Sequence, residues 1–304
     1  MSDIVCLGEP LVEFNQPPAG GEWRQGFGGD TSNAAIAAAR QGAAAAYLSR
    51  VGTDAFGEML RALWRAEGVD DAAVADDAAA PTGLYFVTHG PAGHRFAYRR
   101  AGSAASLMSP ANLPLAAISA ARVLHLSAIS QAISTSACDA CFAAIEAARG
   151  AGVTVSYDTN LRLALWPLPR ARAVIEATLR QADIALPGLD DAIALCGLAD
   201  PDAVCDWLLG LGVGIVALTM GAEGTLVATA ARRERIAARR VEAVDATGAG
   251  DAFDGAFLAE FLATGDPFRA ARYANAAAAL SVTGYGAIAP IPRRPAVEAF
   301  LAGA

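Results

Sequence analysis

Short apolar segments alternate with longer helical segments along most of the chain. Residues 4–8, 45–51, 123–127, 153–158, 184–186 and 215–219 are rich in Val, Ile and Leu, as is typical of strands buried on both faces. Between them, the composition and the spacing of apolar residues predict helices over 32–41, 56–67, 136–149, 171–181, 202–211 and 251–263. Apolar strands that alternate with helices form a parallel sheet covered on both faces. The pattern therefore predicts an α/β fold.

Two segments, 10–28 and 82–103, break this alternation. Within them, residues 84–87 and 95–99 form short alternating runs that are separated by turn residues. Such runs predict β-hairpins rather than helices. We expect the two segments to form a small β-sheet lid beside a large domain of residues 1–9, 29–81 and 104–304.

The composition excludes several kinds of chemistry. Of the 304 residues 54% are hydrophobic, which is ample for a packed core, and all 23 basic residues are arginine because the chain contains no lysine. The absence of lysine excludes a Walker A phosphate loop, a Schiff base with pyridoxal phosphate, and the strand lysine of protein kinases. The three histidines lack the HExxH spacing, so we expect no zinc site built from histidine.

Net charge and cysteine content indicate which partners the protein binds and in which compartment it works. The net charge of −8 opposes binding to nucleic acid, and no basic face with interleaved aromatic residues is evident. Cys138 and Cys141 fall in a predicted helix, so we expect buried thiols there. The first residues lead directly into a strand without a signal peptide, and no apolar stretch is long enough to cross a bilayer. We expect a cytoplasmic protein that binds neither nucleic acid nor a membrane.

Residues 244–254 form a glycine-rich turn that leads into a helix. Gly248 and Gly250 let the backbone turn tightly and bring its N–H groups close to a ligand. The following helix adds unpaired N–H donors and the positive end of its dipole, which together suit a phosphate. Asp251 lies in the first turn, where an aspartate that only caps the helix is the ordinary alternative.

This turn resembles a long signature of the ribokinase-like (PfkB) sugar kinases, which is matched here by Asp245, Thr247, Gly248, Ala249, Gly250 and Asp251. A second segment, residues 28–35, resembles the family's N-terminal G-G-x-x-x-N-x-A motif, and the resemblance extends essentially from end to end. It implies a three-layer fold with a mostly parallel central sheet and a small β-sheet lid, and an ATP-dependent kinase. It also implies that Asp251 takes the proton of the sugar hydroxyl while the N–H groups of Gly248, Ala249 and Gly250 form an anion hole. Phosphoryl transfer depends mainly on positioning and charge stabilisation, so a base of ordinary carboxylate strength would be adequate.

The resemblance also implies a nucleotide site. Residues 219–224 match a T-x-G-x-x-G element that approaches the phosphates, although on its own this sequence predicts a hairpin turn. Asn160 and Arg162 follow a predicted strand, where open α/β sheets place their ligand crevice and where a loop with local Asx hydrogen bonds is the alternative. Asn275 lies on an alanine-rich helix and is assigned to the adenine pocket, with a solvent-facing position as the alternative. The implied ATP-binding residues are Asn160, Arg162, Thr219, Gly221, Gly224, Gly248, Gly250 and Asn275.

Residues 8–14, 27–33, 98–106 and 158–162 resemble 2-keto-3-deoxygluconate kinases within this family. That resemblance assigns Arg100 and Arg162 to the substrate and places Tyr85 and Tyr98 in the lid against it. Planar guanidinium groups bind carboxylates through paired hydrogen bonds, and a neutral sugar gives no reason for two of them. A surface position for Arg100 and a phosphate contact for Arg162 are the alternatives. The implied substrate-binding residues are Gly28, Gly29, Asp30, Asn33, Tyr85, Tyr98, Arg100, Arg162 and Asp251.

Asp30 and Asn33 also suit ordinary helix capping, and that role is compatible with holding sugar hydroxyls. The family's N-x-x-E motif is altered here, with Gly188 at the asparagine position and Asp191 at the glutamate position. Asp191 is still able to hold a hydrated Mg²⁺ through water.

The expected cofactors are ATP and Mg²⁺, with a monovalent cation as a further candidate, and a dimer formed through the lid is expected. The leading hypothesis is a kinase that phosphorylates the 6-hydroxyl of 2-keto-3-deoxygluconate. A fructokinase or another neutral-sugar kinase of the family, and a non-catalytic sensor, are the alternatives.

Overall fold

The computed structural model describes residues 2–16, 20–90 and 93–303. Residues 1 and 304 of the predicted large domain, and residues 17–19 and 91–92 of the predicted lid, lie outside the described residues. In the part that is described, the strands form one nine-stranded sheet and one four-stranded sheet.

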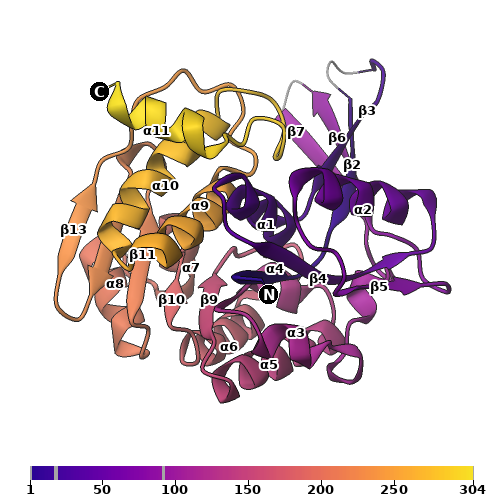
Figure 1. The fold of residues 1–304 in the computed structure, drawn as a ribbon, viewed down its shortest axis with the longest axis horizontal. Helices are drawn as coiled ribbons and strands as arrows, with labels where there is room; N and C mark the ends of the chain where they lie inside the picture. The colour runs from indigo at the N-terminus through magenta and orange to yellow at the C-terminus, as the bar shows by residue number, and fades with distance from the viewer. Residues whose placement is uncertain (1, 17–19, 91–92, 304) are drawn as a thin grey trace.

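The nine-stranded sheet runs through the middle of the molecule (Figure 1). Its strand order is β13-β12-β11-β10-β9-β8-β1-β4-β5. β12 is antiparallel to β11 and β13, and the other pairs are parallel, which confirms a mostly parallel sheet. The strands are β1 (Ile4–Leu7), β4 (Ala45–Gly52), β5 (Val74–Asp77), β8 (Val123–Ser127), β9 (Thr154–Asp158), β10 (Ile184–Ala185), β11 (Ile215–Thr219), β12 (Thr225–Thr229) and β13 (Arg233–Ile236).

Helices cover both faces of this sheet, as predicted (Figure 1). One layer consists of α1 (Asp30–Arg40), α2 (Ala55–Glu67), α9 (Ala249–Thr264), α10 (Pro267–Ser281) and α11 (Arg294–Ala302). The other consists of α3 (Leu115–Ser119), α4 (Ala128–Ala132), α5 (Thr135–Gly150), α6 (Leu168–Leu179), α7 (Leu189–Cys196) and α8 (Pro201–Gly210). Along the ranges given above, no helix has both the length and the apolar character needed to span a bilayer.

The strands supply both apolar cores because their side chains alternate between the two faces. In β1, Val5 and Leu7 pack under α5 and α6, whereas Ile4 and Cys6 pack under α1 and α9. Cys138 and Cys141 of α5 are buried free thiols, as predicted, and burial raises the pKa of both.

All six predicted strands and all six predicted helices are present, with ends displaced by a few residues. The short helices α3, α4, α7 and α11 and the short edge strand β5 were not predicted, and β12 and β13 were not resolved as strands. Three 3₁₀ turns complete this part of the chain: η1 (Ala105–Leu107), η2 (Pro110–Asn112) and η3 (Gly221–Glu223).

The four-stranded sheet projects from the large sheet beside α2 (Figure 1). It consists of β2 (Leu11–Gln16), β3 (Arg24–Gly28), β6 (Leu84–Gly90) and β7 (Gly93–Arg99) in the order β3-β2-β6-β7. The pairs β2–β3 and β6–β7 are antiparallel, which confirms the two predicted hairpins, and β2 and β6 join them in parallel. Phe14 anchors the sheet to α2 by packing edge-on against Phe56, with ring centroids 5.9 Å apart.

Candidate active site

The first turns of α1 and α9 meet at the centre of the candidate site. The Asn33 Nδ2 group of α1 donates a hydrogen bond of 2.8 Å to Oδ2 of Asp251, which lies in the first turn of α9. The helices approach closely because α9 has a glycine at the crossing. A Cβ atom at Gly255 would overlap the Ala34 carbonyl oxygen and lie 2.6 Å from the Ala37 Cβ.

Two glycines shape the turns that precede these helices. Gly29 has φ 109° and Gly248 has φ 76°, in the left-handed region that favours glycine. Asp245 holds the turn before α9, since its carboxylate accepts from the Thr247 and Gly286 N–H groups, each at 2.9 Å. The Ala249 N–H donates to the Ala246 carbonyl at 3.2 Å, so its bond lies within the turn. N–H groups in the first turn of a helix have no partner within that helix, which suits an anion.

The environment of Asp251 makes it a stronger base than an ordinary carboxylate. Burial, and then the negative charge of Asp30, raise the pKa of Asp251 to about 7, while the Asn33 hydrogen bond and the Arg162 charge oppose the rise. Ordinary carboxylate strength would already be adequate for such a base, and the sequence, which assigns Asp30 and Asp251 to one substrate site, gave no measure of how far their proximity raises the pKa of Asp251. A base whose pKa lies near neutral pH is well matched to proton transfer from a hydroxyl.

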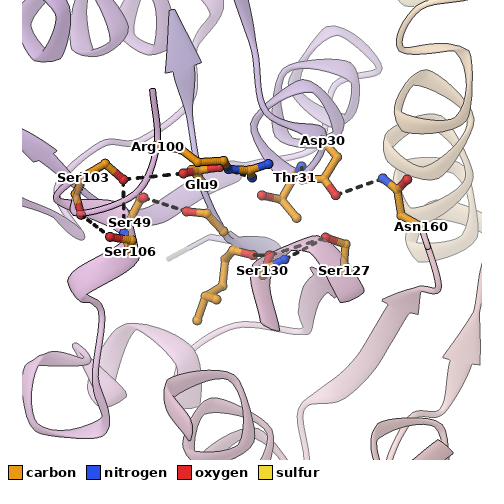
Figure 2. Close-up of polar contacts among 12 residues, drawn as sticks. Glu9, Asp30, Thr31, Ser49, Arg100, Ser103, Ser106, Ser127, Ser130 and Asn160 are labelled. Atoms are coloured by element: carbon orange, nitrogen blue, oxygen red, sulfur yellow. Dashed lines mark hydrogen bonds and ion pairs between the residues drawn. The ribbon is translucent and has the colours of Figure 1, made fainter. Parts of the chain in front are cut away.

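The loop after β9 carries two further predicted residues, Asn160 and Arg162. The Asn160 Nδ2 group donates to Oδ2 of Asp30 at 3.0 Å (Figure 2), and the Asn160 N–H donates to Asp158 at 3.0 Å. The Leu161 N–H donates to Oδ2 of Asp191 at 2.8 Å, which ties this loop to the first turn of α7. Arg162 is exposed at the edge of the same loop.

Several buried polar atoms near this centre lack a hydrogen-bond partner among the described residues, and Thr159 Oγ1 is one of them. Asn33 Oδ1 and Arg100 Nε are buried, and neither has a hydrogen-bond partner among the described residues. Buried polar atoms in folded proteins are nearly always bonded. These atoms therefore retain hydrogen-bonding capacity that no described residue uses.

The small sheet contributes Tyr85, Tyr98 and Arg100. The Tyr85 hydroxyl donates to the buried carboxylate of Glu13, and a Cβ at Gly28 would lie only 2.6 Å from that hydroxyl oxygen. Tyr98 is 44% exposed and stacks on Tyr85 with ring centroids 5.7 Å apart. Arg100 lies over the Tyr98 ring and donates to Glu9, so it is largely buried, and the alternative of a surface position is wrong.

The predicted phosphate element lies between β11 and β12 as the 3₁₀ turn η3 of a β-hairpin. Gly221 is exposed with φ 56°, and Thr219 is half-buried at the end of β11. Gly224 has φ 97°, and a Cβ there would overlap the Ile236 carbonyl oxygen. The hairpin expected from the sequence alone is therefore present, and it leaves the Gly221 backbone accessible.

Asn275 is buried, so its solvent-facing alternative is wrong. Its Oδ1 accepts from the Thr225 hydroxyl at 2.7 Å and its Nδ2 donates to the Ile236 carbonyl at 3.0 Å. These bonds hold α10 against β12 and β13. A cavity of about 300 Å³ adjoins Asn275, lined also by Arg235, Arg239, Arg272 and Leu301.

Four buried carboxylates at or behind the site had no role in the sequence analysis: Glu9, Glu13, Asp158 and Asp254. Asp254 lies one turn after Asp251, with its Oδ2 3.9 Å from His125 Nε2. Burial raises the pKa of Asp254 and Asp158, and it lowers the pKa of His125 to about 4. The signal that points to Asp254 is a second aspartate three residues after Asp251, on an otherwise apolar stretch of α9.

Comparison with known proteins decides the family. The model of the pfkB family carbohydrate kinases matches residues 1–294. The chain belongs to this family.

Its relatives include both sugar-acid and neutral-sugar kinases. A 2-dehydro-3-deoxygluconokinase of Thermoproteus tenax is 36% identical over 305 residues, which cover 96% of this chain and 93% of the relative. Fructokinase-1 of Oryza sativa subsp. japonica is also 36% identical over 305 residues, covering 95% and 94%. Among solved structures, a putative ribokinase II from E. coli in complex with ATP and Mg²⁺ is 27% identical with a TM-score of 0.93, and each chain is covered completely.

The protein is thus an ATP-dependent carbohydrate kinase of the PfkB family with the ribokinase-like fold, as the sequence predicted. Its substrates are ATP and a small-molecule sugar. Relatives named for a sugar acid and for fructose are equally similar to it. The choice of sugar therefore has to be argued from the residues of this chain.

Proposed function

We propose that this PfkB kinase phosphorylates the 6-hydroxyl of 2-keto-3-deoxygluconate, giving 2-keto-3-deoxy-6-phosphogluconate and ADP. The observation that carries the acid preference is the buried Arg100 guanidinium, whose Nε lacks a partner among the described residues. A carboxylate satisfies such a donor better than a neutral hydroxyl does, because charge-assisted hydrogen bonds are stronger. Arg162 supplies the second positive charge.

Asp251 acts as general base in this proposal. The substrate 6-oxygen forms a bond to the γ-phosphorus while the bond from that phosphorus to the bridging oxygen of ADP breaks. Asp251 accepts the hydroxyl proton, and the Asn33 hydrogen bond holds its carboxylate in place. The glycine turn of residues 248–250 receives the charge of the transferring group at the N-terminus of α9.

The remaining predicted substrate residues surround the sugar. Asn33 Oδ1, which has no partner within the described chain, accepts from a sugar hydroxyl, and Asp30 accepts from another. The backbone at Gly28 and Gly29 allows the substrate to approach closely, and Tyr85 and Tyr98 cover it from the small sheet. We propose that this sheet, the lid, closes over the bound sugar and excludes water.

The nucleotide binds across the carboxyl ends of β9 to β11 in this proposal. The residues expected to hold it are Asn160, Arg162, Thr219, Gly221, Gly224, Gly248, Gly250 and Asn275. Among the described residues, no group of three or more acidic, histidine or cysteine side chains forms a metal site by itself. Mg²⁺ is commonly held by one or two carboxylates together with substrate phosphates, so the half-buried Asp191 fits a water-mediated contact. When bound, Mg²⁺ neutralises phosphate charge.

A coupled assay of ATP consumption tests the proposal. We expect kcat/KM to be highest for 2-keto-3-deoxygluconate, compared with fructose, ribose and gluconate. Asp251→Asn should lower kcat by about 10²- to 10⁴-fold, the usual contribution of a general base, whereas the exposed Asp139→Asn should not. A higher kcat/KM for fructose would support the neutral-sugar alternative. A fructokinase is as similar to this chain as the 2-dehydro-3-deoxygluconokinase is. Turnover of none of these sugars would favour a sensor.

We also propose that the lid forms the interface of a dimer. Phe96 and Tyr98 of β7 are 52% and 44% exposed, and they share one face of the small sheet. Adjacent exposed aromatic residues often mark protein–protein contacts.

A further inference from the structure

Glu9 lies where β1 ends and the chain turns toward the small sheet. Only 1% of its surface is exposed, and its carboxylate forms an ion pair with Arg100, the residue that follows β7. Oε1 of Glu9 also accepts from the Ser103 hydroxyl at 3.5 Å. Figure 2 shows Glu9 between Ser103 and Arg100. A residue of the large sheet thus contacts the end of the small sheet through a buried ion pair.

Ser103 is itself fixed, so Glu9 is held from the side opposite Arg100. The Ser103 carbonyl accepts from the Ser106 hydroxyl at 2.7 Å, and both serines are buried. The carboxylate therefore has one orientation from which to receive Arg100.

Arg100 is held on two sides, and its buried Nε has no hydrogen-bond partner among the described residues. Its Nη2 group donates to Glu9, and its guanidinium carbon lies 5.1 Å from the centroid of the Tyr98 ring. A guanidinium is planar and carries five N–H donors in fixed directions. These two contacts fix the plane of the Arg100 guanidinium. The N–H bond of its buried Nε therefore points in a defined direction, and no described residue accepts a hydrogen bond from it.

We propose that Glu9 is a positioning residue, which fixes the Arg100 guanidinium so that its free N–H donors face the carboxylate of the sugar acid. This inference rests on the proposed function. Before the substrate binds, Glu9 also balances a buried charge that would otherwise be uncompensated. A neutral sugar makes no use of this arrangement, so Glu9 sets the preference for an acid.

Four variants test this role by steady-state kinetics: Glu9→Asp, Glu9→Gln, Arg100→Gln and the double variant Glu9→Gln/Arg100→Gln. We expect Glu9→Asp and Glu9→Gln to raise KM for 2-keto-3-deoxygluconate about tenfold, the effect of one charge-assisted hydrogen bond. We expect kcat and the KM for ATP to stay within about twofold, since Asp251 and the glycine turn are untouched. Arg100→Gln should raise the KM for the acid at least as much.

The double variant separates positioning from mere folding. If Glu9 acts through Arg100, its substitution adds nothing to KM once Arg100 is gone, so the double variant should match Arg100→Gln. Glu9→Gln leaves the Arg100 charge buried without its partner and is therefore the variant most at risk of misfolding. The double variant removes both charges and Glu9→Asp keeps both, so the test remains valid even if Glu9→Gln does not fold. Glu67→Gln is the matched control, because Glu67 pairs with Arg40 at 2.7 Å in a similarly enclosed ion pair, and it should leave the KM for the acid unchanged.

The outcomes separate this inference from the proposed function. If the wild type turns over the acid and Arg100→Gln raises its KM while both Glu9 variants leave it unchanged, the role of Glu9 is wrong and the function stands. An additive effect in the double variant, or an equal effect of Glu67→Gln, also overturns the role of Glu9. If the wild type does not phosphorylate the acid, the proposed function fails and the inference fails with it.

Discussion

Asp251 and Asp30 place two carboxylates in one partly enclosed site, and the proximity of these charges changes what Asp251 can do. Burial and the Asp30 charge raise the pKa of Asp251 to about 7. A raised pKa makes the carboxylate a better proton acceptor, but it leaves a fraction of the enzyme protonated near neutral pH. The activity of the free enzyme should therefore depend on pH in the physiological range.

The first prediction is that kcat/KM rises with pH through a limb near pH 7, because only deprotonated Asp251 accepts the hydroxyl proton. Asp30→Asn removes a negative charge that raises the pKa of Asp251. The limb of this variant should move to lower pH, even if the overall rate falls because a sugar contact is lost. The measurement is kcat/KM between pH 5 and 9. A limb at the same pH in both enzymes would show that Asp30 does not control the base.

At the scale of helices, the site depends on how closely α1 and α9 cross. α1 carries Asn33 and α9 carries Asp251, and the 2.8 Å hydrogen bond between them spans this crossing. Gly255 is the residue that allows the approach, since even a methyl group there would overlap the backbone of α1. The position of Asp251, the proposed general base, thus depends on a glycine that has no role in the proposed reaction.

Gly255→Ala should destabilise the protein by about 1–3 kcal/mol, the usual cost of overpacking. It should also lower kcat, because α9 must move away from α1 and carry Asp251 away from Asn33. Thermal unfolding and steady-state kinetics measure the two effects. Gly150→Ala, at the end of α5, is the matched control because a Cβ there meets nothing within 4 Å. A Gly255→Ala enzyme with normal stability and kcat would contradict this account.

Most of the large fold could be predicted because each strand and helix carries its own pattern. Buried parallel strands are apolar along their whole length, and that signal is local. The alanine-rich sequence of α10 lacks this contrast between faces, so it did not reveal that Asn275 is buried. Gly255 also gives no local sign that it lies at a helix crossing.

The contacts within the site were harder to predict because they join distant parts of the chain. Motif resemblance singled out Asp251, Asn33 and Arg100, yet Asn33 and Asp251 are 218 positions apart. Glu9 and Arg100 are 91 positions apart, so nothing in the sequence showed that these charges are paired. The raised pKa of Asp251 in α9 also depends on a long-range contact, because the negative charge that raises it belongs to Asp30 in α1.

At the scale of the whole molecule, the small sheet is attached to the large domain at its base. Strands β2 and β6 pair and so join the two hairpins. Val12 and Leu84 pack with the core under α1 and α9, Phe14 packs on α2, and Arg100 forms an ion pair with Glu9. One face of the sheet carries Tyr85, which is buried, and continues outward to Phe96 and Tyr98. This row of stacked rings runs from the buried Tyr85 to the molecular surface, so the face that we propose to cover the sugar is also the face that we propose to form the dimer interface.

Phe96→Glu should therefore convert a dimer into a monomer. Phe96 is 52% exposed at the outer end of the row, and a charge there would have to be buried without a partner in a lid-to-lid interface. Sedimentation should give twice the 30.9 kDa chain mass for the wild type and a single chain mass for the variant. Leu198→Glu, at an exposed apolar residue just beyond α7, is the control and should leave the dimer intact. A wild-type protein that sediments only as a monomer would refute the proposed interface. The exposed rings of Phe96 and Tyr98 would then have no role in dimer formation.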